Sequence, residues 1–260
     1  MKFIPFMDWQ SILYYLLLFV LAMGVVQSVS IGGLFFLKGT GEKRANVFYG
    51  LLLITIGLTL LHNILFVLGV FEDYPALTFL PIYYTLALPT LLFYYVKLNL
   101  YPQYEMRWTD LKHFILPLGQ FLFFLSLFLR TAEDKSEMGR YFYSPFYGAF
   151  EQFLYLTTFF AYIYFAYRYL YHKRKQLKDQ QEALKVTYLR YLLKGFFVLF
   201  CIHTLFVLGD FFSYEFLNVN LRSIKAYAAL GMLSFAALVF WLGIYGFQVL
   251  VWGKKVFSKG

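Results

Sequence analysis

Long apolar runs alternate with short polar segments along the whole chain. About 20 apolar residues in a helix cross the roughly 30 Å of hydrocarbon in a bilayer. Seven runs fit this length closely enough to be read as spans, at about 11–37, 47–71, 78–96, 113–130, 146–170, 190–213 and 226–250. The pattern predicts an all-α membrane protein in which residues 1–260 form a single transmembrane domain, a seven-helix bundle.

Composition excludes an ordinary soluble domain. The chain is 61% hydrophobic and 14% charged, whereas soluble domains carry about 25% charged residues. The first run has no charge from Trp9 to Leu37, far beyond the roughly 7–15 apolar residues of a signal peptide, so we expect it to be retained as a helix. The single Cys201 cannot form a disulfide within the chain.

The distribution of basic residues predicts the orientation. Lys and Arg concentrate in alternate connecting segments and at the C-terminus, above all in HKRKQLKDQQEALK at 172–185. Because cytoplasmic loops carry this excess, the N-terminus is expected outside and the C-terminus in the cytoplasm. The net charge of +9 is therefore a topology signal, and no nucleic-acid partner is predicted.

Several polar residues fall within the apolar runs, where each costs a few kcal/mol unless it is paired, so they are candidates for function by default. The candidate buried polar site consists of His62, Asn63, Glu151, Gln152, His203 and Asp210.

The pentapeptide LFVLG occurs at 65–69 and again at 205–209, each time shortly after a histidine. Helices two and six would hold equivalent places in a repeat of three helices, a linker helix and three helices. However, His62 lies three residues before its copy and His203 two residues before its copy. This difference turns the imidazoles about 100° apart on a helix. Chance convergence is favoured, and a true repeat stays open.

Catalytic and cofactor chemistry finds little support. A retinal protein needs a lysine in the middle of the last helix, but Lys225 is at its edge. A metal site needs several convergent ligands, and Asp210 is about 10 Å along the helix from His203. No serine nucleophile or phosphate-binding loop is recognisable. We expect no enzyme activity, no catalytic residue, no cofactor and no metal.

Three features suggest contacts with partners. The last run concentrates small residues, including Gly231 and Ser234, which allow close helix packing at the centre of a bundle or in an oligomer. A second candidate is Trp108, Asp110 and His113, although a helix cap and an interface anchor are the favoured explanation of these residues. A third is Lys173, Arg174 and Lys175, which could instead meet anionic lipid.

The stretch ALPTLLFYYVKLNLYPQYEMRWTDLKHFILPL at 86–118 resembles the membrane region of the large AraC-type transcriptional regulators of Bacteroidota. The likeness rests mainly on two groups of residues, Pro89, Leu92, Tyr94, Tyr95, Val96 and Lys97, then Trp108, Asp110, Leu111, His113, Phe114 and Pro117. ANVFYGLLL after the basic loop, and Gly243, Tyr245, Gly246 and Gln248 near the end, extend it. That family continues into a DNA-binding domain, whereas this sequence ends at Gly260, so the DNA-binding activity is not carried over.

The resemblance implies a seven-helix module of the bacterial inner membrane that senses or couples. We therefore expect a non-catalytic sensor or coupling protein, either a sensor or a fixed subunit of an envelope complex. It would act through a membrane-protein partner or a second copy of itself, with membrane lipids around it. The alternative is a small-solute transporter or channel with a polar site between helices two and six.

Overall fold

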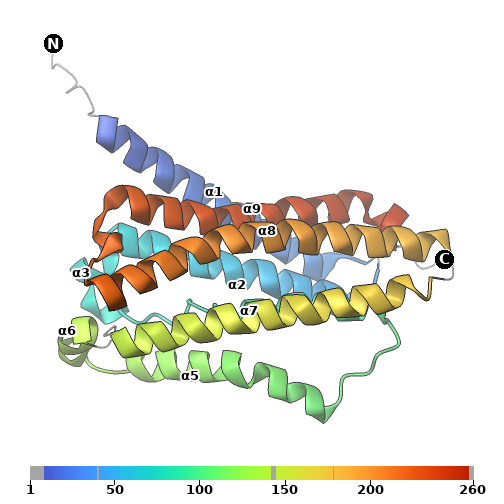
Figure 1. Ribbon diagram of the computed structural model, residues 1–260, viewed down its shortest axis with the longest axis horizontal. Coiled ribbons are helices and arrows are strands. Elements are labelled where there is room, and N and C mark those ends of the chain that lie inside the picture. The colour runs from blue at the N-terminus through green and yellow to red at the C-terminus, as the bar shows by residue number, and fades with distance from the viewer. Residues whose placement is uncertain (1–8, 40, 142–144, 178, 258–260) are drawn as a thin grey trace.

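The computed structural model describes residues 9–39, 41–141, 145–177 and 179–257, which form a bundle of helices without strands (Figure 1). The long helices are α1 (Trp9–Leu37), α2 (Lys43–Val67), α7 (Pro145–Arg174), α8 (Gln180–Leu217) and α9 (Lys225–Phe257). The shorter ones are α3 (Val70–Asp73), α4 (Ala87–Leu100), α5 (Ile115–Phe128) and α6 (Ala132–Tyr141), with 3₁₀ turns η1 (Pro75–Leu77), η2 (Trp108–Phe114) and η3 (Leu221–Ser223).

Five helical segments within these ranges are long and apolar enough to cross a membrane. They are Ser11–Leu37, Lys43–Val67, Trp108–Phe128, Gln180–Tyr214 and Lys225–Trp252. The predicted all-α class and the multi-pass membrane character are thereby confirmed. α4 and α7 do not belong to these five, because α4 has only 14 residues and α7 is rich in tyrosine.

The predicted helix at 78–96 is wrong in its first half. Residues 78–86 are not helical, and the helix begins only at Ala87. Pro81 lies within this segment and cannot donate to a helical hydrogen bond, and Phe79 has a left-handed φ of 63°. At about 1.5 Å per residue, α4 is roughly 21 Å long, too short to cross the hydrocarbon unaided.

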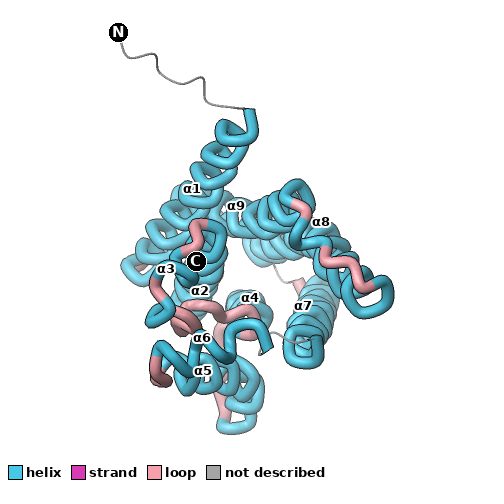
Figure 2. Tube along the Cα trace, turned by 90° about the vertical axis from the view of Figure 1, so that its left-hand side faces the viewer, coloured by secondary structure: helices cyan, strands magenta, loops and turns pink. Residues whose placement is uncertain are grey.

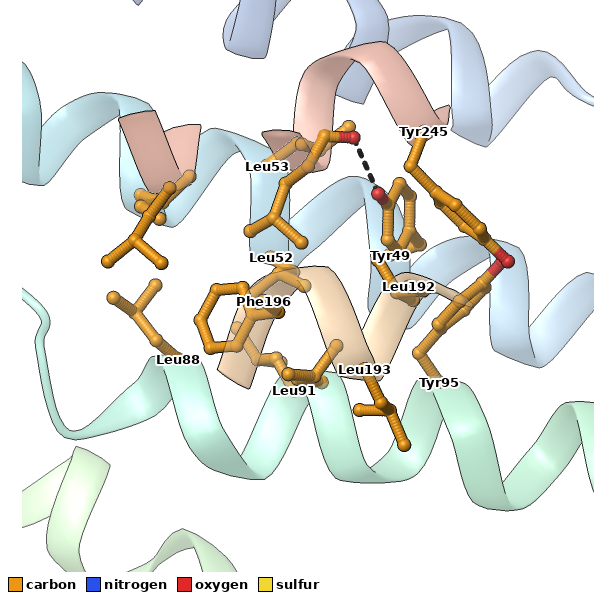
Figure 3. Packing of buried hydrophobic residues seen from close by; sticks show 14 of the residues in the cluster. Tyr49, Leu52, Leu53, Leu88, Leu91, Tyr95, Leu192, Leu193, Phe196 and Tyr245 are labelled. Carbon is orange, nitrogen blue, oxygen red and sulfur yellow. Dashed lines mark hydrogen bonds between the residues drawn. The ribbon is translucent and has the colours of Figure 1, made fainter. Parts of the chain in front are cut away.

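α4 is the central helix of the bundle. All of its residues from Leu88 to Leu100 are buried, and it packs between α2 and α7 (Figure 2). Leu88 and Leu91 of α4 face Leu52 of α2 and Phe196 of α8 in the main core (Figure 3). Since both flanks of α4 are covered by other helices, its sequence is apolar all round rather than on one face.

Small residues let α1 lie close to its two neighbours. Gly32 of α1 and Gly50 of α2 approach so closely that a Cβ on either would lie 3.0 Å or less from the other's carbonyl oxygen. Gly243 of α9 leaves room for the Gln27 side chain of α1, which would be 2.6 Å from an added Cβ. α1 therefore packs closely on the small residues of α9 as well as on α2, and such close backbone approach strengthens van der Waals contact in lipid.

Candidate functional site

The non-helical segment ahead of α4 has backbone groups that helical hydrogen bonds cannot satisfy. Side chains of other helices take this role: the Tyr84 amide donates to Thr59 Oγ1 of α2 at 3.2 Å. The Leu86 amide donates to Gln120 Oε1 of α5 at 3.0 Å. Irregular backbone at membrane depth is tolerated only where protein or a polar cavity satisfies it, so Thr59 and Gln120 fix the start of α4.

A polar cluster lies at this N-terminal end of α4, formed by Thr85, Gln120 and Glu151, and is called here the Glu151 cluster. Gln120 Nε2 donates to Glu151 Oε1 at 2.8 Å and to Thr85 Oγ1 at 3.0 Å. Thr85 Oγ1 lies 3.4 Å from the same carboxylate oxygen. Thr85 and Gln120 are buried, and the carboxylate stands beside the positive end of the α4 dipole, which favours a negative charge.

A second polar cluster lies at the C-terminal end of α4 and is called here the Lys97 cluster. Lys97 Nζ is 3.6 Å from Asp110 Oδ1, and only 7% of each side chain is exposed. Asp110 also accepts hydrogen bonds from Tyr94 Oη at 2.9 Å, Tyr104 Oη at 2.8 Å and the Arg107 amide at 2.8 Å. The buried carboxylate is therefore well satisfied, as burial of a charge requires.

Aromatic rings complete the surroundings of Lys97. Its ammonium lies 3.5 Å from the centre of the Tyr104 ring and 5.4 Å from that of Tyr94, distances at which the ring quadrupole attracts a cation. Burial and the adjacent Asp110 carboxylate raise the pKa of Tyr104. Tyr104 consequently remains a neutral hydrogen-bond donor to Asp110 at neutral pH.

Arg44 of α2 holds the connection that follows α4. Its guanidinium donates to the carbonyl oxygens of Tyr104 at 2.8 Å and Pro102 at 2.6 Å, and it also pairs with Glu42 at 2.8 Å. The segment between α4 and η2 is thus tied to α2 by Arg44 and to α4 by Asp110. Any displacement of α4 along its axis strains these bonds.

His203 and Ser234 form a third polar contact, between α8 and α9. His203 Nδ1 is 2.9 Å from Ser234 Oγ, a separation that a nucleophile and its base would have. Ser234 Oγ, however, donates its hydrogen to the Gly231 carbonyl at 2.6 Å, so the imidazole does not receive it in this arrangement. Phe200, Phe235 and Tyr155 surround the imidazole, and the contact serves helix packing.

The six residues of the predicted buried site lie in separate surroundings. His62 packs against Phe71 and Tyr83, while His203 contacts Ser234, so the two imidazoles have different neighbours. Glu151 joins the Glu151 cluster, and Asp210 is buried on α8. Asn63 and Gln152 are half-buried on α2 and α7. Among the described residues, the buried atoms His62 Nδ1 and Tyr155 Oη have no hydrogen-bond partner.

The predicted partner residues differ in exposure. Trp108 is 88% exposed, whereas Asp110 is buried in the Lys97 cluster and His113 Nδ1 lies 2.7 Å from Tyr162 Oη of α7. At the end of α7, Lys173 pairs with Glu182 at 2.9 Å and Arg174 is exposed. Lys175, the next residue after α7, lies over the Tyr171 ring. Gly231 and Ser234 face α8 through Phe206 and His203.

Sequence reasoning missed four residues of these clusters: Arg44, Thr85, Lys97 and Gln120. Arg44 and Lys97 count among the basic residues that predict the topology, and Lys97 also carries part of the resemblance at 86–118, but neither is predicted to belong to a polar site. The available signal was that Lys97 lies inside the apolar and aromatic run FYYVKLNLY, where an unpaired ammonium is costly. Thr85 and Gln120 gave no comparable signal, because they meet only through the non-helical segment ahead of α4.

In the part of the chain that the structure describes, no group of three or more His, Cys, Asp or Glu side chains is placed to hold a metal ion. Comparison of the chain with protein-family models, with curated proteins and with solved structures finds no match.

Proposed function

We propose that the chain is a non-catalytic sensor or coupling protein, in which a small polar or cationic solute bound at the Glu151 cluster shifts α4 and thereby changes the surface that a protein partner contacts. The single observation that supports this function is a fully buried central helix with a polar cluster at each end. Polar groups at membrane depth are expensive and are functional by default.

The Glu151 cluster suits the binding of a solute. It offers a carboxylate, an amide and a hydroxyl within hydrogen-bonding distance of one another, at a helix start that follows non-helical backbone. Solute sites of membrane proteins are often built at such interrupted helices. A solute that competes for Gln120 would break its hydrogen bond with the Leu86 amide, and this bond fixes the start of α4.

The Lys97 cluster is suited to transmit a movement of α4 to the surface that a partner contacts. Movement of α4 acts on Asp110 through Lys97 and Tyr94. Asp110 accepts the Arg107 amide and so caps η2, the turn whose first residue is the exposed Trp108. Trp108 and the basic segment around Lys173 to Lys175 then form the surface offered to a membrane-protein partner or to a second copy of this chain. Burial of an exposed aromatic side chain is a common source of binding energy at interfaces.

The topology and location belong to the same proposal. In this proposal, α4 and α7 cross the membrane together with the five apolar helices. The N-terminus is then outside, and the excess of Lys and Arg supports a cytoplasmic position for the segment 172–185 in a bacterial inner membrane. The resemblance to the membrane region of AraC-type regulators of Bacteroidota agrees with a sensing or coupling role. It also supplies a reason to look for an envelope complex that contains this chain.

A photo-crosslinking amino acid at position 108 tests the output, in cells of the native host. We expect a crosslink to one partner protein or to a second copy, and a changed yield when Glu151→Gln alters the Glu151 cluster. Crosslinker at Leu205, a similarly exposed position on α8, is the control for random lipid-facing contacts. Glu72→Gln, at an exposed glutamate, controls for loss of charge. The absence of a crosslink at position 108 contradicts the proposal, and so does a crosslinking yield that Glu151→Gln leaves unchanged.

A small-solute transporter is the second candidate, because the non-helical residues 78–86 bring irregular backbone to the Glu151 cluster, and transporters build their sites from such unwound backbone. Proton flux into vesicles that contain the purified protein and a pH-sensitive dye distinguishes the two functions. Flux that is abolished by Glu151→Gln supports a proton-coupled transporter. Flux no greater than in protein-free vesicles, together with a crosslink at position 108, supports the sensor.

A further inference from the structure

A surface hollow of about 230 Å³ lies between α8 and α9, away from both polar clusters. It is lined by Tyr188, Tyr191, Trp241, Ile244, Tyr245 and Gln248. Both helices contain segments long and apolar enough to cross a membrane, and Tyr191 and Ile244 are 65% and 48% exposed. The volume is below the roughly 300–1,000 Å³ of sites for drug-sized ligands, so it accommodates part of one acyl chain rather than a bulky solute.

The wall of this hollow is fixed rather than adaptable. The Trp241 indole donates through Nε1 to the Leu192 carbonyl at 3.1 Å, and it lies directly over Gly195, where any Cβ would overlap the ring. Tyr245 is buried and contacts Tyr95 and Tyr49 of the core (Figure 3). A rigid aromatic wall costs little conformational entropy when it binds an apolar chain.

Polarity is confined to one end of the hollow and its rim. Tyr188 lies toward the N-terminal end of α8, and Gln248 lies toward the C-terminal end of α9. Because the two helices run in opposite directions, both residues are at the same end of the hollow. Arg190 and Lys194 are exposed on α8 one turn apart and flank Tyr191. Because helical side chains tilt toward the helix N-terminus, both cations extend toward this polar end. An apolar chain with a negatively charged head complements this arrangement.

We propose that the hollow binds one anionic phospholipid, whose acyl chain lies against Trp241 and Ile244 and whose phosphate group pairs with Arg190 and Lys194. This site does not depend on the Glu151 cluster or on the proposed signalling function. Long basic side chains at the edge of a membrane attract anionic headgroups, and the aromatic hollow adds the positional preference that free bilayer lipid lacks.

Fluorescence of Trp241 provides the test. In the variant Trp9→Phe, Trp108→Phe, Trp252→Phe, which changes three exposed tryptophans, Trp241 is the single indole left among the four. The protein is placed in phosphatidylcholine vesicles that contain either brominated-chain phosphatidylglycerol or brominated-chain phosphatidylcholine in equal proportion. We expect phosphatidylglycerol to quench with about fivefold higher relative affinity, the factor that one basic residue near an anionic surface provides.

Two variants in this background separate the parts of the site. Arg190→Gln with Lys194→Gln should abolish the difference between the two lipids. Ile244→Phe should fill the hollow and reduce quenching by both, whereas Ile202→Phe, at a comparably exposed isoleucine of α8, should not. Equal quenching by both lipids, or a preference that survives the loss of both cations, overturns the proposal. Quenching that is unaffected by Ile244→Phe overturns it as well.

Discussion

Lys97 is the charged side chain whose environment departs most from what its sequence position suggests. Its ammonium is enclosed by Tyr94, Tyr104 and Asp110 instead of extending to lipid headgroups or water. Removal of one partner from a buried pair typically costs about 3–5 kcal/mol, because the other charge is left uncompensated. An exposed pair contributes only about 0–1 kcal/mol. The chain also contains a less buried pair, Lys173 with Glu182, whose side chains are 16% and 30% exposed, which permits a comparison.

Lys97→Met is therefore expected to lower the free energy of unfolding by about 3 kcal/mol or more. Lys173→Met, which breaks the more exposed pair with Glu182, should lower it by less than about 1 kcal/mol. Lys97→Met combined with Asp110→Asn should cost less than the sum of the single substitutions, since no buried charge remains. Chemical denaturation in detergent micelles measures all four variants. Additive costs would show that Lys97 and Asp110 do not stabilise each other.

At the scale of elements, α8 and α9 approach each other closely at Gly195 and Trp241, and no sequence pattern predicts this contact. Gly195 does not belong to a recognisable small-residue motif, yet the Trp241 indole occupies the place of its missing side chain. Gly33 of α1 offers the contrast, because nothing lies within 4 Å of a Cβ added there. Both glycines are inside helices, so replacement by alanine should favour the helix by up to about 1 kcal/mol at either position.

Gly195→Ala should nevertheless destabilise the protein by about 1–3 kcal/mol, the usual cost of overpacking. Gly33→Ala should be neutral or slightly stabilising. Trp241→Phe, introduced together with Gly195→Ala, should recover part of the loss, because the smaller ring leaves room for the methyl group. Thermal unfolding followed by circular dichroism compares the variants. Equal effects of Gly195→Ala and Gly33→Ala would mean that α9 can shift away from α8 without cost.

Hydrophobic patterning predicted most helices because each long run must bury its backbone polar groups in a helix. It located α1, α2, α8 and α9 to within about ten residues at their ends. It failed at residues 78–86, where the run is apolar but Pro81 and the left-handed Phe79 prevent a helix. Apolar composition reports burial and cannot distinguish a helix from an extended segment that other helices enclose.

The polar clusters were only partly predictable for a related reason. Glu151 is a predicted candidate because a carboxylate near membrane depth requires a partner, whereas Asp110 is predicted only as a helix cap or a partner contact. Their partners Lys97 and Gln120 are separated from them by 13 and 31 residues in sequence. Periodicity within one helix carries no information about such pairs, because they form where the ends of different helices meet.

At the scale of the whole molecule, the two ends of the bundle differ in charge, and this difference predicts which end faces the cytoplasm. Gln103 and Gln176 are exposed near the basic end, and Asp73 and Ser136 are exposed at the opposite end. Seven crossings require that the chain changes sides between each consecutive pair of these positions along the sequence. The short α4 and the tyrosine-rich α7 are the crossings that this requirement tests.

Single cysteines at the four positions, in a Cys201→Ser background, are to be labelled in intact cells with a membrane-impermeant maleimide. We expect labelling of Asp73→Cys and Ser136→Cys in intact cells, and of Gln103→Cys and Gln176→Cys only after permeabilisation, because Lys and Arg accumulate on the cytoplasmic side. The reverse pattern would invert the orientation. Labelling of positions 73 and 103 from the same side would show that the segment containing α4 enters the membrane without crossing it, and the Lys97 cluster would then face the same side as the Glu151 cluster.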